Sequence, residues 1–247
     1  MKNILIIFGS CLILFLTINI FLKPTNANAQ SFIGAWERNH ISKDGVKLKS
    51  IVIFSKSHQV LTTYETLTGE FIYSNGGTWK FNNNIMTKKV EFDTNDSTRV
   101  GSIISFDVKI SDSIVSVVGG NMKFKRIDNG RPGKLNGAWL MSARFKEGTK
   151  QLRDTTNPRK TMKILSGTRF QWIAYNTESK KFMATGGGSY STLNGEYVEN
   201  IEFFSRDNSR IGVSLKFNFQ LLDNKWEHKG FSSKGNPIHE IWSKRSD

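Results

Sequence analysis

Cysteine is nearly absent from this chain of 247 residues, because the only one, Cys11, lies in an apolar run near the N-terminus. The residues after this run therefore contain no disulfide, no thiolate nucleophile and no cysteine-type zinc site. They also lack any segment that keeps an apolar 3.6-residue period over three turns, which argues against long amphipathic helices. A fold without cross-links depends on its hydrophobic core for stability.

The usual signatures of catalysis and metal binding are lacking as well. No Gly-x-Ser-x-Gly elbow is present, and no two histidines have the H-x-H or H-x-x-x-H spacing that presents two imidazoles to one metal. We therefore expect no cofactor and assign no catalytic or metal-binding residue. A metal site would remain an alternative if His228 and His239 met on neighbouring strands, and an enzymatic role stays open.

Residues 1–29 have the pattern of a secretory signal peptide. Lys2 precedes the apolar run Ile4–Leu22, and Ala27-Asn28-Ala29 supplies small residues for cleavage before Gln30. A retained membrane anchor is the alternative, since the run approaches the length of a membrane span. Cys11 has too little of the run before it to serve as a lipid-attachment site. We expect a periplasmic or secreted protein with a cleaved signal peptide that is not a lipoprotein.

Acidic residues are too few to balance the basic ones, and the formal net charge of the chain is +14. Removal of the signal peptide with Lys2 and Lys23 lowers this charge to +12. For an exported chain, envelope glycans or anionic small molecules are more plausible partners than nucleic acid, which we do not expect. The basic residues form no block of five or six, so a soluble basic surface without a specific partner is the simpler interpretation.

An internal repeat organises the rest of the chain. A shift of 111 residues superposes 50–110 on 161–221 without a gap, and 14 of these 61 positions are identical, where ordinary residue frequencies predict about 4. "DSTRVGSIISFDVKI" at 96–110 and "DNSRIGVSLKFNF" at 207–219 show the match most clearly. The openings "IGAWERN" and "NGAWLMS" differ by 103, so the second copy carries eight extra residues, which we place in a loop at "LRDTTNPRK".

The seam between the copies is predicted at "DNGRPGK", residues 128–134, where Gly, Pro and Asn cluster. The predicted domains are a signal peptide at 1–29, a first barrel at 30–128, a linker at 129–134 and a second barrel at 135–247. Each copy has the length of an independently folding unit.

Both copies read as all-β. Apolar and β-branched runs of five to eight residues alternate with turn residues, which fits a sandwich or a closed barrel. From Ile211 to Phe219 every second residue is apolar, and so long a strand favours a bent barrel wall with one face inside. Gly76-Gly77 and Gly187-Gly188 are predicted to be bends or bulges in that wall. Most strands are too short for an outer-membrane barrel.

The "GAW" that opens each copy, together with "KFKRI" and "WSKR" on the last strands, resembles the signature of lipocalin-like domains. The resemblance implies two tandem lipocalin-like antiparallel β-barrels. It also implies a basic side chain over each tryptophan ring: Arg126 or Lys125 over Trp36, and Arg245 or Lys244 over Trp139. The closing stretch "GFSSKGNPIHEIWSKR" resembles an uncharacterised lipocalin-like family of exported bacterial proteins, which brings no activity with it.

Positions shared by the two copies are interpreted as scaffold. The carboxylates of Asp96 and Asp207 are predicted to accept backbone N–H groups in a turn. Their neighbours Arg99 and Arg210 are expected to pair with an acid, with Glu91 and Glu202 as candidates. An anion-binding role for the two arginines is the alternative.

Positions where the copies diverge are better candidates for function, because the second copy gains aromatic side chains with a polar group. We expect these side chains to hold a small hydrophobic or amphipathic ligand inside the second barrel, with two arginines neutralising an acid group on it. The candidates are Trp172, Tyr190, Phe219, Trp226, His228, Arg144 and Arg169. The first barrel is expected to be filled by its own side chains. The alternative function is a non-catalytic envelope scaffold or protein-interaction module with both barrels filled.

Overall fold

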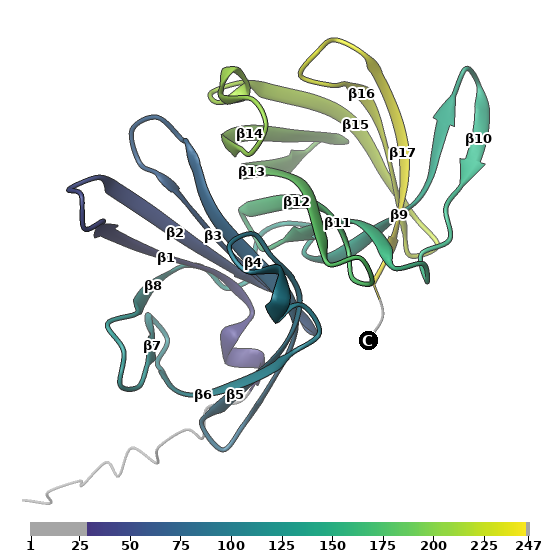
Figure 1. The fold of residues 1–247 in the computed structure, drawn as a ribbon. Coiled ribbons are helices and arrows are strands. Elements are labelled where there is room, and N and C mark those ends of the chain that lie inside the picture. The colour runs from purple at the N-terminus through teal and green to yellow at the C-terminus, as the bar shows by residue number, and fades with distance from the viewer. Residues whose placement is uncertain (1–28, 246–247) are drawn as a thin grey trace, which may run out of the picture.

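The computed structural model describes residues 29–245, so the predicted signal peptide, apart from Ala29, lies outside the described residues. The fold is nearly all-β, with two closed eight-stranded antiparallel barrels in tandem, as the sequence predicted (Figure 1). The three helices of the described part are single 3-10 turns, and none of them could cross a membrane.

The first barrel is a simple up-and-down meander. Each strand pairs antiparallel with the next, and β1 closes the barrel by pairing with β8. A 3-10 turn, η1 (Ala29–Phe32), precedes it. The strands are β1 (Gly34–Ile41), β2 (Lys47–Phe54), β3 (His58–Glu65), β4 (Phe71–Asn82), β5 (Ile85–Asp93), β6 (Ile103–Ile110), β7 (Ile114–Val117) and β8 (Lys123–Asp128).

The second barrel repeats this order and adds one strand. β10 forms a hairpin with the second half of β9 and projects from the barrel, while β9 and β17 close the ring (Figure 1). The predicted loop of extra residues runs between β10 and β11. The strands are β9 (Gly137–Lys146), β10 (Thr149–Leu152), β11 (Arg159–Leu165), β12 (Arg169–Asn176), β13 (Lys181–Leu193), β14 (Glu196–Phe204), β15 (Ser214–Leu222), β16 (Lys225–Phe231) and β17 (Pro237–Lys244).

The long alternating strand begins later than its pattern suggested. The apolar alternation predicted a strand from Ile211, but β15 begins at Ser214. The residues before it form the 3-10 turn η3 (Asn208–Arg210), and the first barrel has the matching turn η2 (Ser97–Arg99). Within β15, Leu215 and Phe217 do pack inside the second barrel.

The predicted turn role of Asp96 and Asp207 is confirmed. Asp96 accepts the backbone N–H of Thr98 at 2.9 Å, and Asp207 accepts that of Ser209 at 3.1 Å. The carboxylates therefore cap η2 and η3 through the donors that such short turns leave free.

The two arginines pair with neighbouring acids, as predicted, but the candidate partners Glu91 and Glu202 are wrong. Arg99 pairs with Asp93 at 2.9 Å, and Arg210 pairs with Asp207 at 3.0 Å. Glu91 and Glu202 are instead engaged by side chains of the opposite barrel, so they are not the partners of these arginines.

The predicted bulges are present at the paired glycines. The pairing register shifts between Gly76 and Gly77 in β4, and between Gly187 and Gly188 in β13. A Cβ atom on Gly77 would lie 2.0 Å from the carbonyl oxygen of Lys89, and one on Gly188 would lie 2.0 Å from that of Asn200. Glycine is required at both positions because the neighbouring strand approaches where a side chain would begin.

The opening tryptophan of each barrel is buried and has a basic side chain over its ring. Trp36 donates its indole N–H to the carbonyl of Phe32 at 2.9 Å, and the Arg126 guanidinium lies 3.9 Å from its ring centre. In the second barrel Trp139 donates to the carbonyl of Leu135 at 2.8 Å, and the Lys244 ammonium lies 4.8 Å from its ring centre. Of the candidate pairings, those with Arg126 and Lys244 are the ones formed.

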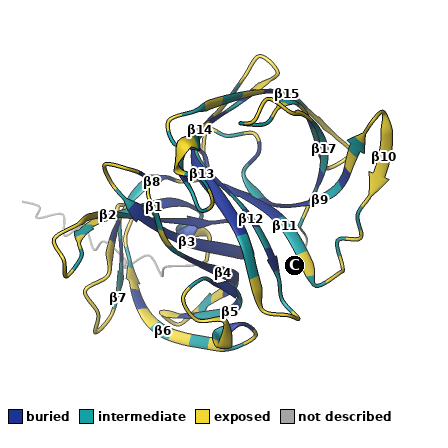
Figure 2. Ribbon diagram, turned by 45° about the horizontal axis from the view of Figure 1, so that its top comes forward, coloured by how far each residue is buried: buried dark blue, intermediate teal, exposed yellow. Residues whose placement is uncertain are grey.

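The two barrels pack against each other through an apolar interface. Buried residues are concentrated on the strands that face the other barrel, including β3, β12 and β13 (Figure 2). The contact includes Ile51, Ile53, Val60, Met162, Ile164 and Ile173. Many of the buried apolar side chains therefore lie between the barrels, and fewer lie inside them.

Aromatic rings at this interface follow the repeat. Tyr64 stacks on Phe203 with ring centres 5.1 Å apart, and Phe92 meets Tyr175 at the same separation. Each of these contacts is the other shifted by the repeat offset, so the interface is a pseudo-twofold one.

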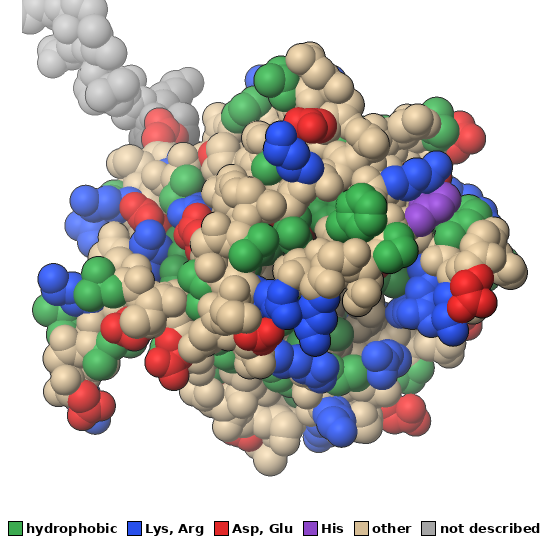
Figure 3. Space-filling view, turned by 90° about the horizontal axis from the view of Figure 1, so that it is seen from above, with side chains coloured by type: hydrophobic (Ala, Val, Ile, Leu, Met, Phe, Trp, Pro, Cys, Tyr) green, Lys and Arg blue, Asp and Glu red, His purple; other side chains and the backbone are tan. Residues whose placement is uncertain are grey.

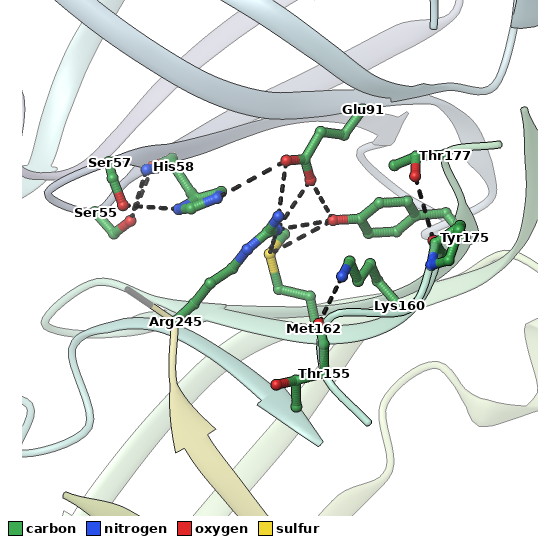
Figure 4. A network of polar contacts seen from close by, with 11 residues as sticks. Ser55, Ser57, His58, Glu91, Thr155, Lys160, Met162, Tyr175, Thr177 and Arg245 are labelled. Atoms are coloured by element: carbon green, nitrogen blue, oxygen red, sulfur yellow. Dashed lines mark hydrogen bonds and ion pairs between the residues drawn. The ribbon is translucent and has the colours of Figure 1, made fainter. Parts of the chain in front are cut away.

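Two glutamates are held across the same interface. Tyr64 donates to Glu202 at 2.7 Å, and Tyr175 donates to Glu91 at 2.5 Å. Arg245, which follows β17, also binds both oxygens of Glu91, at 2.7 and 2.9 Å (Figure 4). Burial on its own would raise the pKa of Glu91, but the charge and hydrogen bonds of Arg245 outweigh burial and hold that pKa below its usual value.

Candidate functional site

The first barrel contains a cavity of about 340 Å³, so the prediction of a filled first barrel is wrong. This volume lies at the lower end of the range for small-molecule pockets, roughly 300–1,000 Å³. Its wall is mainly apolar and includes Val52, Phe54, Leu61, Met86, Phe106 and Phe124. The smaller Val and Ile side chains of this copy leave the interior open.

One side of this cavity carries hydrogen-bond donors. Lys88 on β5 is half-buried and donates to the side-chain oxygen of Asn75 at 3.1 Å. No carboxylate of the described residues lies within 4.0 Å of its ammonium group. The side-chain amide nitrogen of Gln59 is buried in the same wall and has no hydrogen-bond partner among residues 29–245. Acceptor groups in the cavity would satisfy donors of this kind.

The charge of Lys88 is poorly compensated by its surroundings. Burial, and next the positive charge of Arg99, lower the pKa of Lys88 to about 8, while the charge of Asp93 acts in the opposite direction. Arg99 lines the same cavity and is itself paired with Asp93, which is fully buried. Two cations and one carboxylate therefore lie at this end, and the excess charge is positive.

The second barrel contains a cavity of about 290 Å³ with a different polar wall. Lys163 on β11 and Glu199 on β14 form a buried ion pair of 2.7 Å, and Tyr197 donates to the same carboxylate oxygen at 2.7 Å. The Lys163 ammonium also lies 4.9 Å from the ring centre of Trp226 and 5.1 Å from that of Trp242. The pair is thus held by charge, hydrogen bonds and aromatic faces together.

A second polar pair lines the same cavity. The Nε2 atom of His228 lies 3.0 Å from Glu240, and the indole N–H of Trp242 donates to the same oxygen at 3.2 Å. Burial, with the nearby charge of Lys163, lowers the pKa of His228, so its imidazole is neutral at pH 7. Burial would raise the pKa of Glu240, but its hydrogen bonds with His228 and Trp242 and the nearby charge of Lys163 outweigh that effect and lower it. The Nδ1 atom of His228 is buried and has no partner among the described residues.

The structure brings the predicted aromatic residues together in one hydrophobic cluster of the second barrel, but not all of the predicted site residues line its cavity. Trp172 and His228 line the second cavity, whereas Phe219 packs in the core of that barrel beside His228. Trp226 is fully buried, and Tyr190 is buried with its hydroxyl donating to the carbonyl of Ser166 at 2.7 Å. The aromatic gains of the second copy thus fill much of its barrel and leave part of it open.

The two predicted arginines lie away from both cavities. Arg144 is exposed on β9, where it lines a surface depression with Arg153 and Arg159. Arg169 pairs with Glu202 at the interface between the barrels. On the face drawn in Figure 3, acidic side chains lie between the Lys and Arg side chains, in agreement with the scattered charges of the sequence.

The polar residues of the cavities were missed, although the sequence contained a signal for them. Lys88 lies two residues from Met86 and from Val90, both buried, so period-two alternation turns its side chain inward. The repeat offset aligns Lys88 with Glu199, which exchanges a cation for a carboxylate inside otherwise similar strands. Lys163 and Glu240 carried no comparable signal, because Lys163 aligns with the apolar Val52 and Glu240 lies beyond the aligned residues 161–221.

Metal binding has no evident site in the described residues. Between residues 29 and 245 no three His, Asp or Glu side chains gather closely enough to hold an ion. His239 lies 2.6 Å from Glu227 and stacks on Phe145, away from His228. The chemistry that both cavities offer is the binding of a small molecule with an apolar part and a charged or polar part.

A family model described as a domain of unknown function (DUF4488) matches residues 134–246, which comprise the second barrel. The closing stretch 230–245, which carried the resemblance noted from the sequence, lies within the matched part. No curated protein matches the chain significantly. Together with the two closed eight-stranded barrels, the match fits a lipocalin-like fold, without showing membership of a lipocalin family.

Proposed function

We propose that this protein is an exported, non-catalytic binding protein that holds a small amphipathic anion in its first barrel. The observation that carries the proposal is the side-chain pair of Lys88 and Gln59 in an otherwise apolar cavity. An ammonium without a carboxylate partner and an amide nitrogen without an acceptor both favour an anionic group in the cavity. The proposal of export rests on the signal-like residues 1–29.

The apolar wall defines the rest of the ligand. Met86 and Phe124 are buried in that wall, and Arg99 and Met122 are partly exposed at its margin. A ligand with its acid group near Lys88 would place its apolar part against the buried residues, where burial of each CH₂ group contributes about 0.8 kcal/mol. Alkanoates and similar monoanionic amphiphiles fit this description.

The second barrel, in which the sequence placed the ligand, has one observation in its favour. Trp172 and His228 line its cavity, as expected for a binding site. Its charged groups are already paired or acidic, so it is less suited to an anion than the first barrel. A pure scaffold role predicts that neither cavity binds a small molecule, and the surface depression at Arg144 would then be the place to look for an envelope glycan partner.

The first prediction concerns Lys88→Met. Octanoate is expected to bind the wild-type protein, and the variant is expected to lose about ten- to hundredfold in affinity, as for a lost hydrogen bond to a charged group worth roughly 1.5–3 kcal/mol. Isothermal titration calorimetry measures the change. Lys89→Met is the matched control, because Lys89 is the exposed neighbour on β5 and its loss removes the same charge. Equal affinities of the two variants, or no binding of octanoate at all, would contradict the proposal.

The second prediction concerns pH. Because the pKa of Lys88 is about 8, its charge is present below that pH, and octanoate affinity should fall as the pH rises from 7 to 9.5. Without ligand, the stability of the fold changes with pH in the opposite direction. Between pH 8 and the usual lysine pKa the unfolded chain binds more protons than the folded chain, so the free energy of unfolding rises with pH. Both slopes should disappear in Lys88→Met relative to Lys89→Met, as measured by calorimetry and urea unfolding.

A further inference from the structure

We propose that the second barrel is a separate site for an amphiphile of the opposite charge, one with a protonated amine as its head group. Glu199 occupies the position in β14 that Lys88 holds in β5, and both line the cavity of their own barrel. Equivalent strand positions therefore present a cation in the first cavity and a carboxylate in the second. This site goes beyond the anion site of the first barrel and does not depend on it.

The charged groups of the second cavity leave an excess of negative charge. Lys163 neutralises Glu199 in the buried pair of 2.7 Å. The hydrogen-bond partners of Glu240 are the imidazole of His228 and the indole of Trp242, and both of these are neutral donors at pH 7. Glu240 is thus a half-buried carboxylate in the cavity wall with two hydrogen bonds and no Lys or Arg nitrogen of the described residues within 4.0 Å, although the more distant charge of Lys163 also acts on it. A ligand ammonium would supply the missing charge.

His228 provides the second, independent observation. Its Nε2 atom donates to Glu240, so in the neutral ring the Nδ1 atom is an acceptor. The side chain is 1 % exposed and lines the cavity, and Nδ1 has no partner among the described residues. A buried acceptor of this kind calls for a donor, which an ammonium group provides and a carboxylate does not.

The aromatic wall has the same preference. Trp172, Phe217 and Trp242 line the cavity, and an ammonium group is attracted to such ring faces. Lys163 already demonstrates this environment, because its ammonium lies within 5.7 Å of four ring centres, those of Tyr197, Phe217, Trp226 and Trp242. The apolar side chains Phe204, Leu215 and Ile238 complete the wall and would cover the tail of the ligand.

The experiment compares octylammonium, 1-octanol and octanoate on the full chain at pH 7, with saturating octanoate present when the first two are titrated. Octylammonium should bind at least tenfold more tightly than 1-octanol and with one site per chain. Glu240→Gln, which preserves the size of the side chain, should reduce octylammonium affinity at least tenfold and leave octanoate affinity unchanged. Glu196→Gln is the control, because Glu196 is an exposed carboxylate on β14 and the net charge changes equally.

Several results would overturn this assignment. Octylammonium binding no better than 1-octanol, equal affinities of Glu240→Gln and Glu196→Gln, or displacement of octylammonium by octanoate would each refute a separate amine site. If Glu240→Gln does not fold, the comparison of octylammonium with 1-octanol on the wild-type chain still decides the matter. A failure of octanoate to bind, with octylammonium binding intact, would refute the anion site alone.

Discussion

Replacing Glu199 by leucine is expected to destabilise the protein by about 3–5 kcal/mol, the range for a buried ion pair that loses one partner. The reason is that the Lys163 side chain is 6 % exposed and would lose its carboxylate partner inside the barrel. Tyr197 would lose the acceptor of its hydroxyl at the same time. Urea unfolding at pH 7 measures the difference.

The double variant Lys163→Met with Glu199→Leu separates this cause from simple loss of packing. Removing both charges should restore most of the lost stability, because apolar groups of similar volume replace a buried pair at little cost.

Glu196→Leu on the same strand serves as control. Its pair with Lys216 is exposed, with side chains 49 % and 69 % exposed, so the expected change is below about 0.5 kcal/mol. A double variant as unstable as Glu199→Leu would rule out the uncompensated charge as the cause.

Replacing Arg245 by methionine is the second change with a large expected effect, about 3 kcal/mol at pH 7. Glu91 is 12 % exposed and would keep only the hydroxyl of Tyr175 as a close donor from the second barrel. Arg169→Met is the comparison, because Arg169 pairs with Glu202, the repeat counterpart of Glu91. Its partner Glu202 is 29 % exposed, so water compensates for more of the loss and the effect should be smaller.

The pH dependence of the same variant provides a second test. In the wild type the pKa of Glu91 is lowered, so its contribution to stability is present above the unfolded pKa and is lost as the pH falls through the folded one. In Arg245→Met burial would raise that pKa, and protonation would then relieve the cost of the buried charge. The difference between wild type and Arg245→Met should therefore shrink from pH 7 to pH 4 in urea unfolding. A difference that is constant with pH would contradict the role given to Glu91.

The repeat and the ends of the barrels could be read from the sequence because their causes are local. Asp96 and Asp207 cap turns through donors two residues away, and Trp36 binds a carbonyl four residues away. The basic side chain over Trp36 lies on the adjacent strand β8, where the resemblance placed it. Short-range geometry of this kind leaves a pattern in the chain.

The interface and the cavities depend on contacts between distant residues, and the sequence contains little trace of them. Tyr64 and Glu202 are identical to their repeat partners, which suggested a role within each barrel, yet they bind each other across the two. Whether the inward-facing side chains fill the interior of a barrel or leave a cavity depends on the side chains of all eight strands together. For this reason the first barrel, which had smaller side chains, was expected to be filled and instead contains a partly open cavity.

The pseudo-twofold contact between the barrels has a consequence for what one molecule can carry. Two identical subunits joined by a symmetric contact would have identical interiors, because every side chain would occur twice. Here both halves belong to one polypeptide, so one half has Lys88 where the other has Glu199, while Tyr64 and Tyr175 still hold the halves together in matching ways. Covalent linkage thus gives the molecule two unlike compartments in a fixed one-to-one ratio at any concentration.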